Sequence, residues 1–137
     1  MPPDQERKLY LEGIRLFNEQ SFFEAHETWE EIWHHATGAK RAFYQGLIQA
    51  AVALEHYRRS NPRGVQSLHR TYTAKLKQLP QRFMGINLEA FMQQLEATLQ
   101  PALSTNIAPQ QGDIQFDPTS APKIVLEYDP FETGEVG

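Results

Sequence analysis

The amino-acid sequence predicts an all-α protein, a single bundle of about five helices followed by an extended C-terminal tail. Three observations support this fold class. Apolar residues recur at helical spacing through most of the first 104 residues, and capping residues and prolines separate the amphipathic segments. After residue 104, prolines and scattered glycines replace this helical pattern. Since 137 residues is near the usual size of one domain, we expect a helical bundle domain over 1–104 and an extended, proline-containing tail over 105–137.

Sequence signals place the first two helices. Apolar residues at helical spacing predict the first helix over 4–19. The sequence SFFE at 21–24 matches a capping box, in which the Ser21 side chain accepts from the backbone amide of Glu24 and Glu24 reaches back. We therefore expect the second helix to begin at Ser21. It should end before Gly38, because glycine suits the left-handed position that follows a helix.

The third helix is predicted over about 40–59 and is apolar almost all round. Such a helix is expected to be the central and most buried one of its bundle. The short connection ATGA at 36–39 joins it to the second helix. Because short connections join neighbouring helices, we expect the second and third helices to pack as an antiparallel hairpin.

Caps and prolines mark the last two helices. The Asn-Pro dipeptide at 61–62 is a start signal for the fourth helix, and Pro80 should stop it. Asn87 should cap the fifth helix, and Pro101 should end it. In the tail, KIVLEY at 123–128 has the composition of a short strand, which is stable only if it docks on another element.

Composition narrows the class of protein. Hydrophobic residues make up 40% of the chain and charged residues 22%, as in ordinary globular domains. No apolar run approaches the roughly 20 residues of a membrane span, and the first residues, MPPDQERK, do not resemble a signal segment. We expect a cytoplasmic protein with no membrane partner. The absence of cysteine excludes disulfides, thiolate ligands and a cysteine nucleophile, so any metal site must use His and carboxylates.

Charge is distributed in blocks of opposite sign. Five Glu and no basic residue lie between Arg15 and Lys40, whereas residues 58–82 contain seven Arg or Lys and no acid. The basic helix over 58–82 predicts an alternative function, a non-enzymatic interaction module for a protein partner or a nucleic acid. The net charge of −4 and the lack of interleaved aromatic residues argue against nucleic acid. A homodimer remains open.

The second and third helices carry a candidate pocket. His26 and Glu30 fall on the aromatic face of the second helix, and a polar stripe runs along the otherwise apolar third helix. Folding the hairpin about 37–38 places Glu30 level with Gln45 and His26 level with Gln49, to within about one turn. The candidate pocket residues are His26, Trp29, Glu30, Trp33, Gln45, Gln49 and His56.

Two interpretations of this cluster stay open. Buried polar groups must be satisfied, and they could satisfy one another in a hydrogen-bond network that fixes the helix register, the interpretation that we favour. Alternatively they line a small-ligand or enzymatic pocket, in which His26 or Glu30 would act as the base and Gln45 and Gln49 would orient the substrate. Gly46, opposite Trp29 and Glu30 in this register, would let the helices approach closely or leave room for a ligand.

A metal site is the least favoured version of this cluster, and no other cofactor is expected. HETWE at 26–30 is not the HExxH motif of zinc proteases, because Glu30 replaces the second imidazole. His26, Glu30 and His56 are the residues that would bind a divalent metal as a His–carboxylate–His site.

Three blocks of the sequence resemble a known family, the domain-of-unknown-function 309 family. They are FNEQSFFEAHETWEEIW (17–33), FYQGLIQAAVALEHYRRSNPRG (43–64) and LP followed by GINLEAF (79–91), within about residues 9–103. The resemblance implies a small all-helical bundle and a cytosolic protein, with no established activity and no agreed catalytic residues. The motif positions are Glu24, His26, Glu27, Trp29, Glu30, Trp33, Gln45, Gly46, Gln49, His56 and Asn61.

Overall fold

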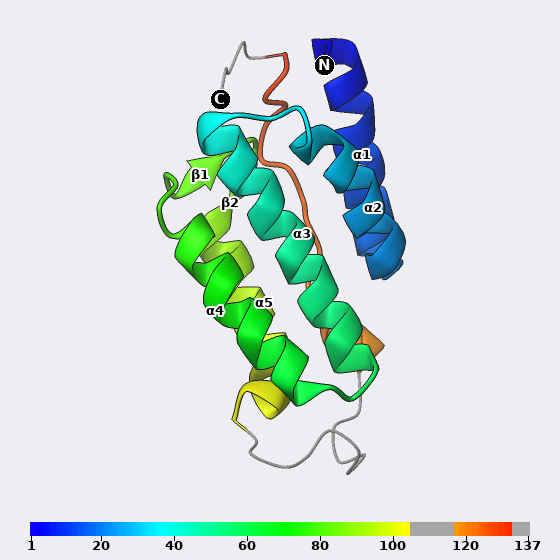
Figure 1. Cartoon of the computed structure of the whole chain (residues 1–137), viewed down its shortest axis with the longest axis vertical. Helices are drawn as coiled ribbons and strands as arrows, with labels where there is room; N and C mark the ends of the chain where they lie inside the picture. The colour runs from blue at the N-terminus through cyan, green and yellow to red at the C-terminus, as the bar shows by residue number, and fades with distance from the viewer. Residues whose placement is uncertain (105–116, 133–137) are drawn as a thin grey trace.

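The computed structural model describes residues 1–104 and 117–132 of the chain, and five α-helices dominate this part (Figure 1). The predicted all-α fold with five helices is confirmed. Of the predicted tail, 105–116 and 133–137 lie outside the described residues. The elements are α1 (Pro3–Asn18), α2 (Phe22–Trp33), α3 (Gly38–Arg58), α4 (Pro62–Leu76), β1 (Arg82–Phe83), β2 (Ile86–Asn87), α5 (Leu88–Leu103) and the 3-10 turn η2 (Pro118–Ser120).

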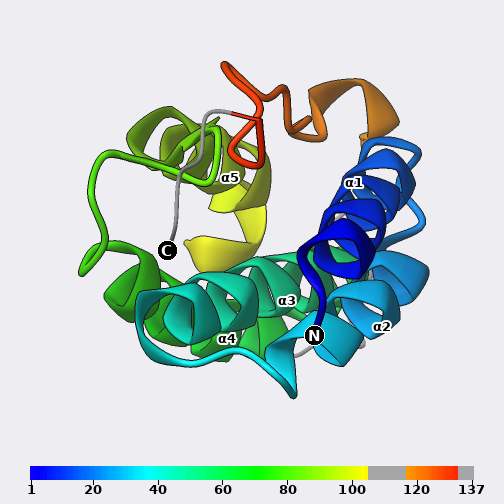
Figure 2. The same cartoon turned by 90° about the horizontal axis from the view of Figure 1, so that it is seen from above.

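The helix α3 lies between two pairs of helices. In the view from above, α1 and α2 lie on one side of α3, and α4 and α5 lie on the other (Figure 2). The described part of the tail runs between α1 and α5, on the side of the molecule opposite α3 (Figure 2). Ten residues of α3 are buried, more than in any other described helix, so its predicted central position is confirmed.

Two of the predicted helix caps form as expected. The side-chain oxygen of Asn61 accepts from the backbone N–H of Gly64, at 3.2 Å, and that of Asn87 accepts from Ala90, at 3.1 Å. Each bond satisfies one of the N–H groups that a helix leaves unpaired at its start, which explains why α4 and α5 begin where they do.

The predicted cap of α2 is wrong. Ser21 is the N-cap residue, but its side chain makes no capping hydrogen bond. The other end also differs, since α2 stops at Trp33 and Gly38, with a φ of 61°, begins α3 instead. Arg41 ends α2 by donating to the carbonyl oxygens of Trp33, at 2.9 Å, and Ala36, at 3.3 Å.

The last helix and the segment before it also depart from expectation. Pro101 lies inside α5, which continues to Leu103. Proline removes the bond to the carbonyl four residues earlier, but that carbonyl belongs to Ala97, an exposed residue at which water can replace the donor. An unpredicted hairpin of two short strands, β1 and β2, precedes α5. Met84 and Gly85 form its turn, with φ values of 53° and 83°. No helix in the described residues is long and apolar enough to cross a membrane.

Candidate functional site

The predicted polar cluster is divided between different parts of the structure. His26 Nε2 lies 3.1 Å from Glu30 Oε2, and Nδ1 lies 3.1 Å from the carbonyl oxygen of Phe23. Both ring nitrogens therefore contact their own helix. The side chains of His26 and Glu30 are 19% and 45% exposed, so the pair lies near the surface of α2, and its contacts do not reach α3.

The third histidine position lies elsewhere. His56 Nδ1 is 3.0 Å from Asn61 Nδ2, at the turn between α3 and α4. Its ring packs against Gly64, where an added Cβ would come within 2.7 Å of the imidazole. The described residues contain no group of three His, Asp or Glu that could hold a metal ion. The site proposed from His26, Glu30 and His56 is therefore wrong, because His56 faces α4 and not α2.

The two glutamines of α3 make no hydrogen bond to α2 among the described residues. Gln49 Oε1 is buried without a partner there. The prediction for Gly46 is wrong, because an added Cβ at this glycine would lie 2.5 Å from Leu76 of α4 and not against α2. One face of α3 therefore contacts α4 at a position where the sequence analysis expected α2.

The two tryptophans are held by other contacts. Trp29 is fully buried and packs on Gly13 of α1, and its Nε1 donates to the carbonyl oxygen of Tyr10, at 3.3 Å. Trp33 lies beneath the guanidinium of Arg41, whose carbon is 4.0 Å from the ring centroid. Both rings thus fix how α2 is attached to its neighbours.

A buried polar group that sequence reasoning missed lies between α1 and α3. The Tyr44 hydroxyl donates to Glu6 Oε2, at 2.7 Å, and Lys40 Nζ lies 3.2 Å from the same oxygen. Burial, and then the charge of Glu6, raise the pKa of Tyr44 well above its ordinary value. A tyrosine with no exposed surface and a raised pKa stays protonated at neutral pH, which suits a structural donor.

A second missed pair lies in a small cleft of about 170 Å³ between α4 and α5. His69 Nε2 is 3.2 Å from Glu96 Oε1, across the two helices. The ring of Tyr72 packs edge-on against His69, with centroids 5.4 Å apart, and burial raises the pKa of Tyr72. Predicting this pair would have required knowing how α4 packs on α5, and no local sequence pattern shows that.

The basic side chains of the segment 58–82 include three exposed cations. These cations recur every seventh residue, Arg63 and Arg70 on α4 and Lys77 directly after its last residue, so they lie along one face of the helix. No ion pair of the described residues joins them to the acidic residues of α2. The two charge blocks therefore do not neutralise each other within the fold.

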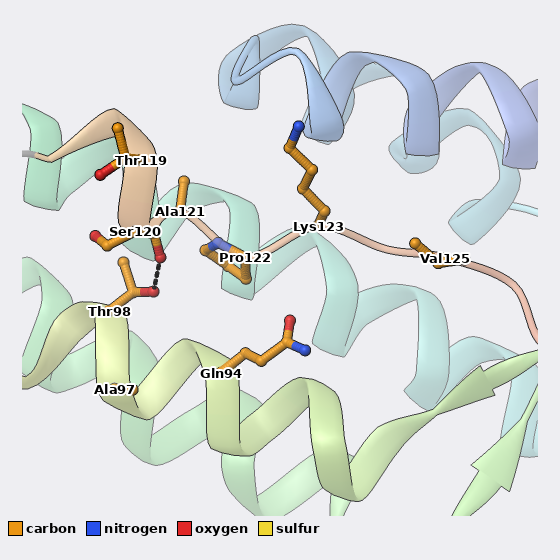
Figure 3. Close-up of a pocket in the computed structure, with 9 residues that line it drawn as sticks. All are labelled: Gln94, Ala97, Thr98, Thr119, Ser120, Ala121, Pro122, Lys123 and Val125. Carbon is orange, nitrogen blue, oxygen red and sulfur yellow. Dashed lines mark hydrogen bonds between the residues drawn. The ribbon is translucent and has the colours of Figure 1, made fainter.

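A larger groove lies between α5 and the described tail (Figure 3). Its volume is about 500 Å³, and a hollow of about 170 Å³ continues it, with Gln94, Lys123 and Val125 common to both. We call the tail residues 121–127 the strap. The groove is lined by Gln94, Ala97, Thr98, Thr119, Ser120, Ala121, Pro122, Lys123 and Val125, and the smaller hollow adds Ile86, Asn87, Ala90, Phe91, Ile124 and Glu127.

Contacts on both sides hold the strap in place. On the side of α1, the Asn18 side chain accepts from the N–H of Ile124, at 2.7 Å, and donates to its carbonyl oxygen, at 2.9 Å. On the side of the hairpin, the Glu127 N–H donates to the Gly85 carbonyl oxygen, at 2.8 Å. The strap is thereby suspended between α1 and the start of α5.

A turn beyond the strap adds a salt bridge to α1. Asp129 Oδ2 lies 2.5 Å from Arg7 Nη2. Hydrogen bonds from the backbone N–H groups of Phe131 and Glu132, together with Arg7, hold the pKa of Asp129 below its ordinary value. This carboxylate therefore stays charged while it fastens the turn after the strap to α1.

Most of the residues that line the groove are small or polar. Its lining includes one cation, Lys123, and a threonine, Thr98, whose hydroxyl donates to the Ser120 carbonyl oxygen at 2.5 Å (Figure 3). No carboxylate or histidine among these residues lies beside that hydroxyl to act as a base. What the groove offers a ligand is small side chains, an amide and exposed backbone.

Comparison with known proteins finds a match to a family of unknown function and two uncharacterised relatives. The family model described as "Domain of unknown function (DUF309)" matches residues 10–68. The chain is 31% identical to an uncharacterized protein of Aquifex aeolicus (strain VF5) over 96 residues, 69% of this chain and 29% of that protein. It is 40% identical to the uncharacterized protein YpuF of Bacillus subtilis (strain 168) over 63 residues, 44% of this chain and 36% of YpuF.

These matches leave the groove outside the family model. The chain spans about a third of the length of the curated relatives that it matches. The matched residues 10–68 run from α1 into α4, whereas α5 and the strap come later in the chain. The predicted resemblance to the DUF309 family is confirmed by the family match over residues 10–68.

Proposed function

We propose that this chain is a non-enzymatic interaction module that holds a segment of a partner protein in the groove between α5 and the strap. The observation that supports it most directly is an open groove of about 500 Å³ between α5 and the strap. This volume falls in the range of roughly 300–1,000 Å³ that is typical of ligand sites. Its walls come from segments far apart in sequence, so the bundle holds them in a fixed relation.

The test uses a display library of random linear peptides, selected on the immobilised full chain. Ala97 is exposed on the α5 wall of the groove, so Ala97→Trp should fill part of the groove without disturbing the core. Ala74, exposed on α4 away from the groove, supplies the matched control Ala74→Trp. Selected peptides should bind the wild-type chain and Ala74→Trp alike, and Ala97→Trp at least tenfold more weakly by fluorescence anisotropy.

Two results would overturn this proposal. The first is a selection that enriches no peptide, although the immobilised chain keeps its helical circular dichroism. The second is a set of enriched peptides that bind Ala97→Trp as well as wild type, because their binding surface would then lie elsewhere on the bundle.

A second candidate function is the predicted small-ligand or enzymatic pocket between α2 and α3. One observation favours it, namely the buried Oε1 of Gln49, which has no hydrogen-bond partner among the described residues. An acceptor left unpaired costs about 1–3 kcal/mol, and a ligand donor would remove that cost. A thermal-shift screen of small polar metabolites tests it. A compound that raises the melting temperature of wild type but not of Gln49→Met would support the pocket.

A further inference from the structure

The strap has the geometry of an extended chain. Side-chain burial alternates along it, since Pro122 and Ile124 are buried while Lys123, Val125 and Glu127 are exposed. A period of two is the pattern of extended backbone, in which successive side chains point to opposite faces. The strap is nevertheless in no sheet of the described residues, because the described sheet contains only β1 and β2.

One edge of this extended segment is paired at Ile124. Both backbone groups of Ile124 bond to the side chain of Asn18, on the side of α1. In an extended chain, the N–H and C=O of one residue point to one edge, and those of the next residue point to the other. The backbone groups of Lys123 and Val125 must therefore point away from Asn18.

The opposite edge faces the groove and is unpaired at Lys123 and Val125. The N–H of Glu127, on this same edge, bonds to Gly85 at the hairpin before α5, which fixes its direction. Lys123 and Val125 line both hollows beside α5, and neither has a backbone hydrogen bond among the described residues. Figure 3 shows the Lys123 side chain pointing away from α5, so it leaves the space between the strap and α5 free.

We propose that the partner segment enters the groove as an extended strand and pairs with the backbone of Lys123 and Val125. This inference rests on the proposed function and specifies the form of its ligand. Two N–H and two C=O groups offer alternating positive and negative partial charges, which a second extended chain complements with its own amides and carbonyls. A helical partner cannot supply this match, because its backbone groups are already paired internally.

The residues that line the groove also indicate which side chains the partner segment should carry. Alternate side chains of an added strand would point toward α5, where the small residues Ala90 and Ala97 form the walls of the two hollows. Their neighbours would point to solvent beside Val125, whose side chain is 78% exposed. The segment should therefore alternate small apolar residues with polar ones and should lack proline at the residues that pair with the strap.

The experiment removes one donor from the paired edge. Val125→Pro deletes the N–H that faces the groove, and the exposed side chain leaves the core unchanged. Val125→Ala is the matched control, because it shortens the same side chain but keeps the N–H. With the peptides selected for groove binding as probes, Val125→Pro should weaken binding roughly tenfold and Val125→Ala less than threefold.

A second measurement does not depend on the folding of the proline variant. The selected peptides are N-methylated at single residues and titrated against the wild-type chain. Methyl groups at every other residue should abolish binding, and those between them should leave it within threefold, because only one edge of the peptide pairs with the strap.

The outcomes separate the two proposals. Strand addition would be overturned by peptides that fail to bind Ala97→Trp but bind Val125→Pro as well as wild type, and that still bind when N-methylated at any residue. The groove would then remain the binding site. Failure of the peptide selection itself would overturn both. A chain that dimerises in light scattering and becomes monomeric on Val125→Pro would show that a second copy takes this edge, which overturns the partner peptide as its occupant.

Discussion

The substitution Asn18→Ala should release the strap from α1. Asn18 makes two hydrogen bonds to Ile124, at 2.7 and 2.9 Å, and both lie in a partly buried setting. A neutral hydrogen bond contributes about 0.5–1.5 kcal/mol to stability, so the pair contributes about 1–3 kcal/mol. Since 1.4 kcal/mol corresponds to about a factor of ten in an equilibrium constant, opening of the strap should increase roughly 5- to 150-fold.

Amide hydrogen exchange measures this opening at a site that the substitution does not touch. The Glu127 N–H bonds to Gly85 and not to Asn18, so its exchange should accelerate only if the strap opens as a unit. The matched control is Gln20→Ala, which removes a single exposed hydrogen bond to Pro118 and should change the exchange of Glu127 less than threefold. Exchange of core amides in α3 should stay unchanged in both variants.

One result would refute this reasoning. If Asn18→Ala accelerates exchange at Ile124 alone and leaves Glu127 protected, the strap does not open as a unit. Its attachment near Gly85 would then be sufficient to hold it, and Asn18 would only satisfy two local backbone groups.

Four other predictions concern stability. Acid should weaken the contact of Asp129 with α1, because the folded pKa of Asp129 lies below its ordinary value of 3.8. The contribution of this contact to stability is complete above pH 3.8 and is lost as the pH falls through the lower, folded pKa. In Asp129→Asn, the denaturant midpoint should therefore depend less on pH in this range. Tyr44→Phe should cost about 1–3 kcal/mol in urea unfolding, since it removes a buried donor to a carboxylate. Gly13→Ala should lower the melting temperature, because the added Cβ collides with the Trp29 indole and overpacking of about 1–3 kcal/mol exceeds the gain in helix propensity of about 1 kcal/mol. Gln49→Met should raise urea stability by about 1 kcal/mol, by removing an unpaired acceptor; a loss of stability would contradict this account.

The helices were predictable because their signals are local. Asn61 and Asn87 cap the helices that follow them, and each bond spans three residues. The central position of α3 also followed from its composition, since a cylinder that is apolar almost all round must be covered on most sides. Where local signals failed, a more distant contact decided the outcome, as when Arg41 ended α2 ahead of Gly38.

The candidate cluster could not be resolved from periodicity. Helical spacing shows which residues of α3 share a face, but it does not show which neighbour covers that face. Gly46 packs on α4, and His56 faces the turn into α4, although both were predicted to face α2. A helix in the middle of a bundle has several neighbours, so its polar stripes have several alternative partners.

The groove was outside the reach of sequence analysis for a different reason. Its open edge depends on the hydrogen bonds between Asn18 and Ile124, which are 106 residues apart. The sequence KIVLEY at 123–128 indicated extended backbone that needed a docking site, but nothing in it identified α1 as that site. The side chain of Asn18 replaces a neighbouring strand at one edge of the strap and leaves the other edge unpaired.

If this edge binds a partner, binding and docking of the strap must be linked. The groove has two walls only while the strap is docked, so the apparent affinity falls in proportion to the docked fraction of the chain. Asn18→Ala should therefore weaken peptide binding only to the extent that it populates the open strap, and saturating peptide should restore the protection of Glu127. If Asn18→Ala weakens peptide binding while the Glu127 N–H exchanges at its wild-type rate, binding and docking of the strap are not linked. The partner would then contact Asn18 itself.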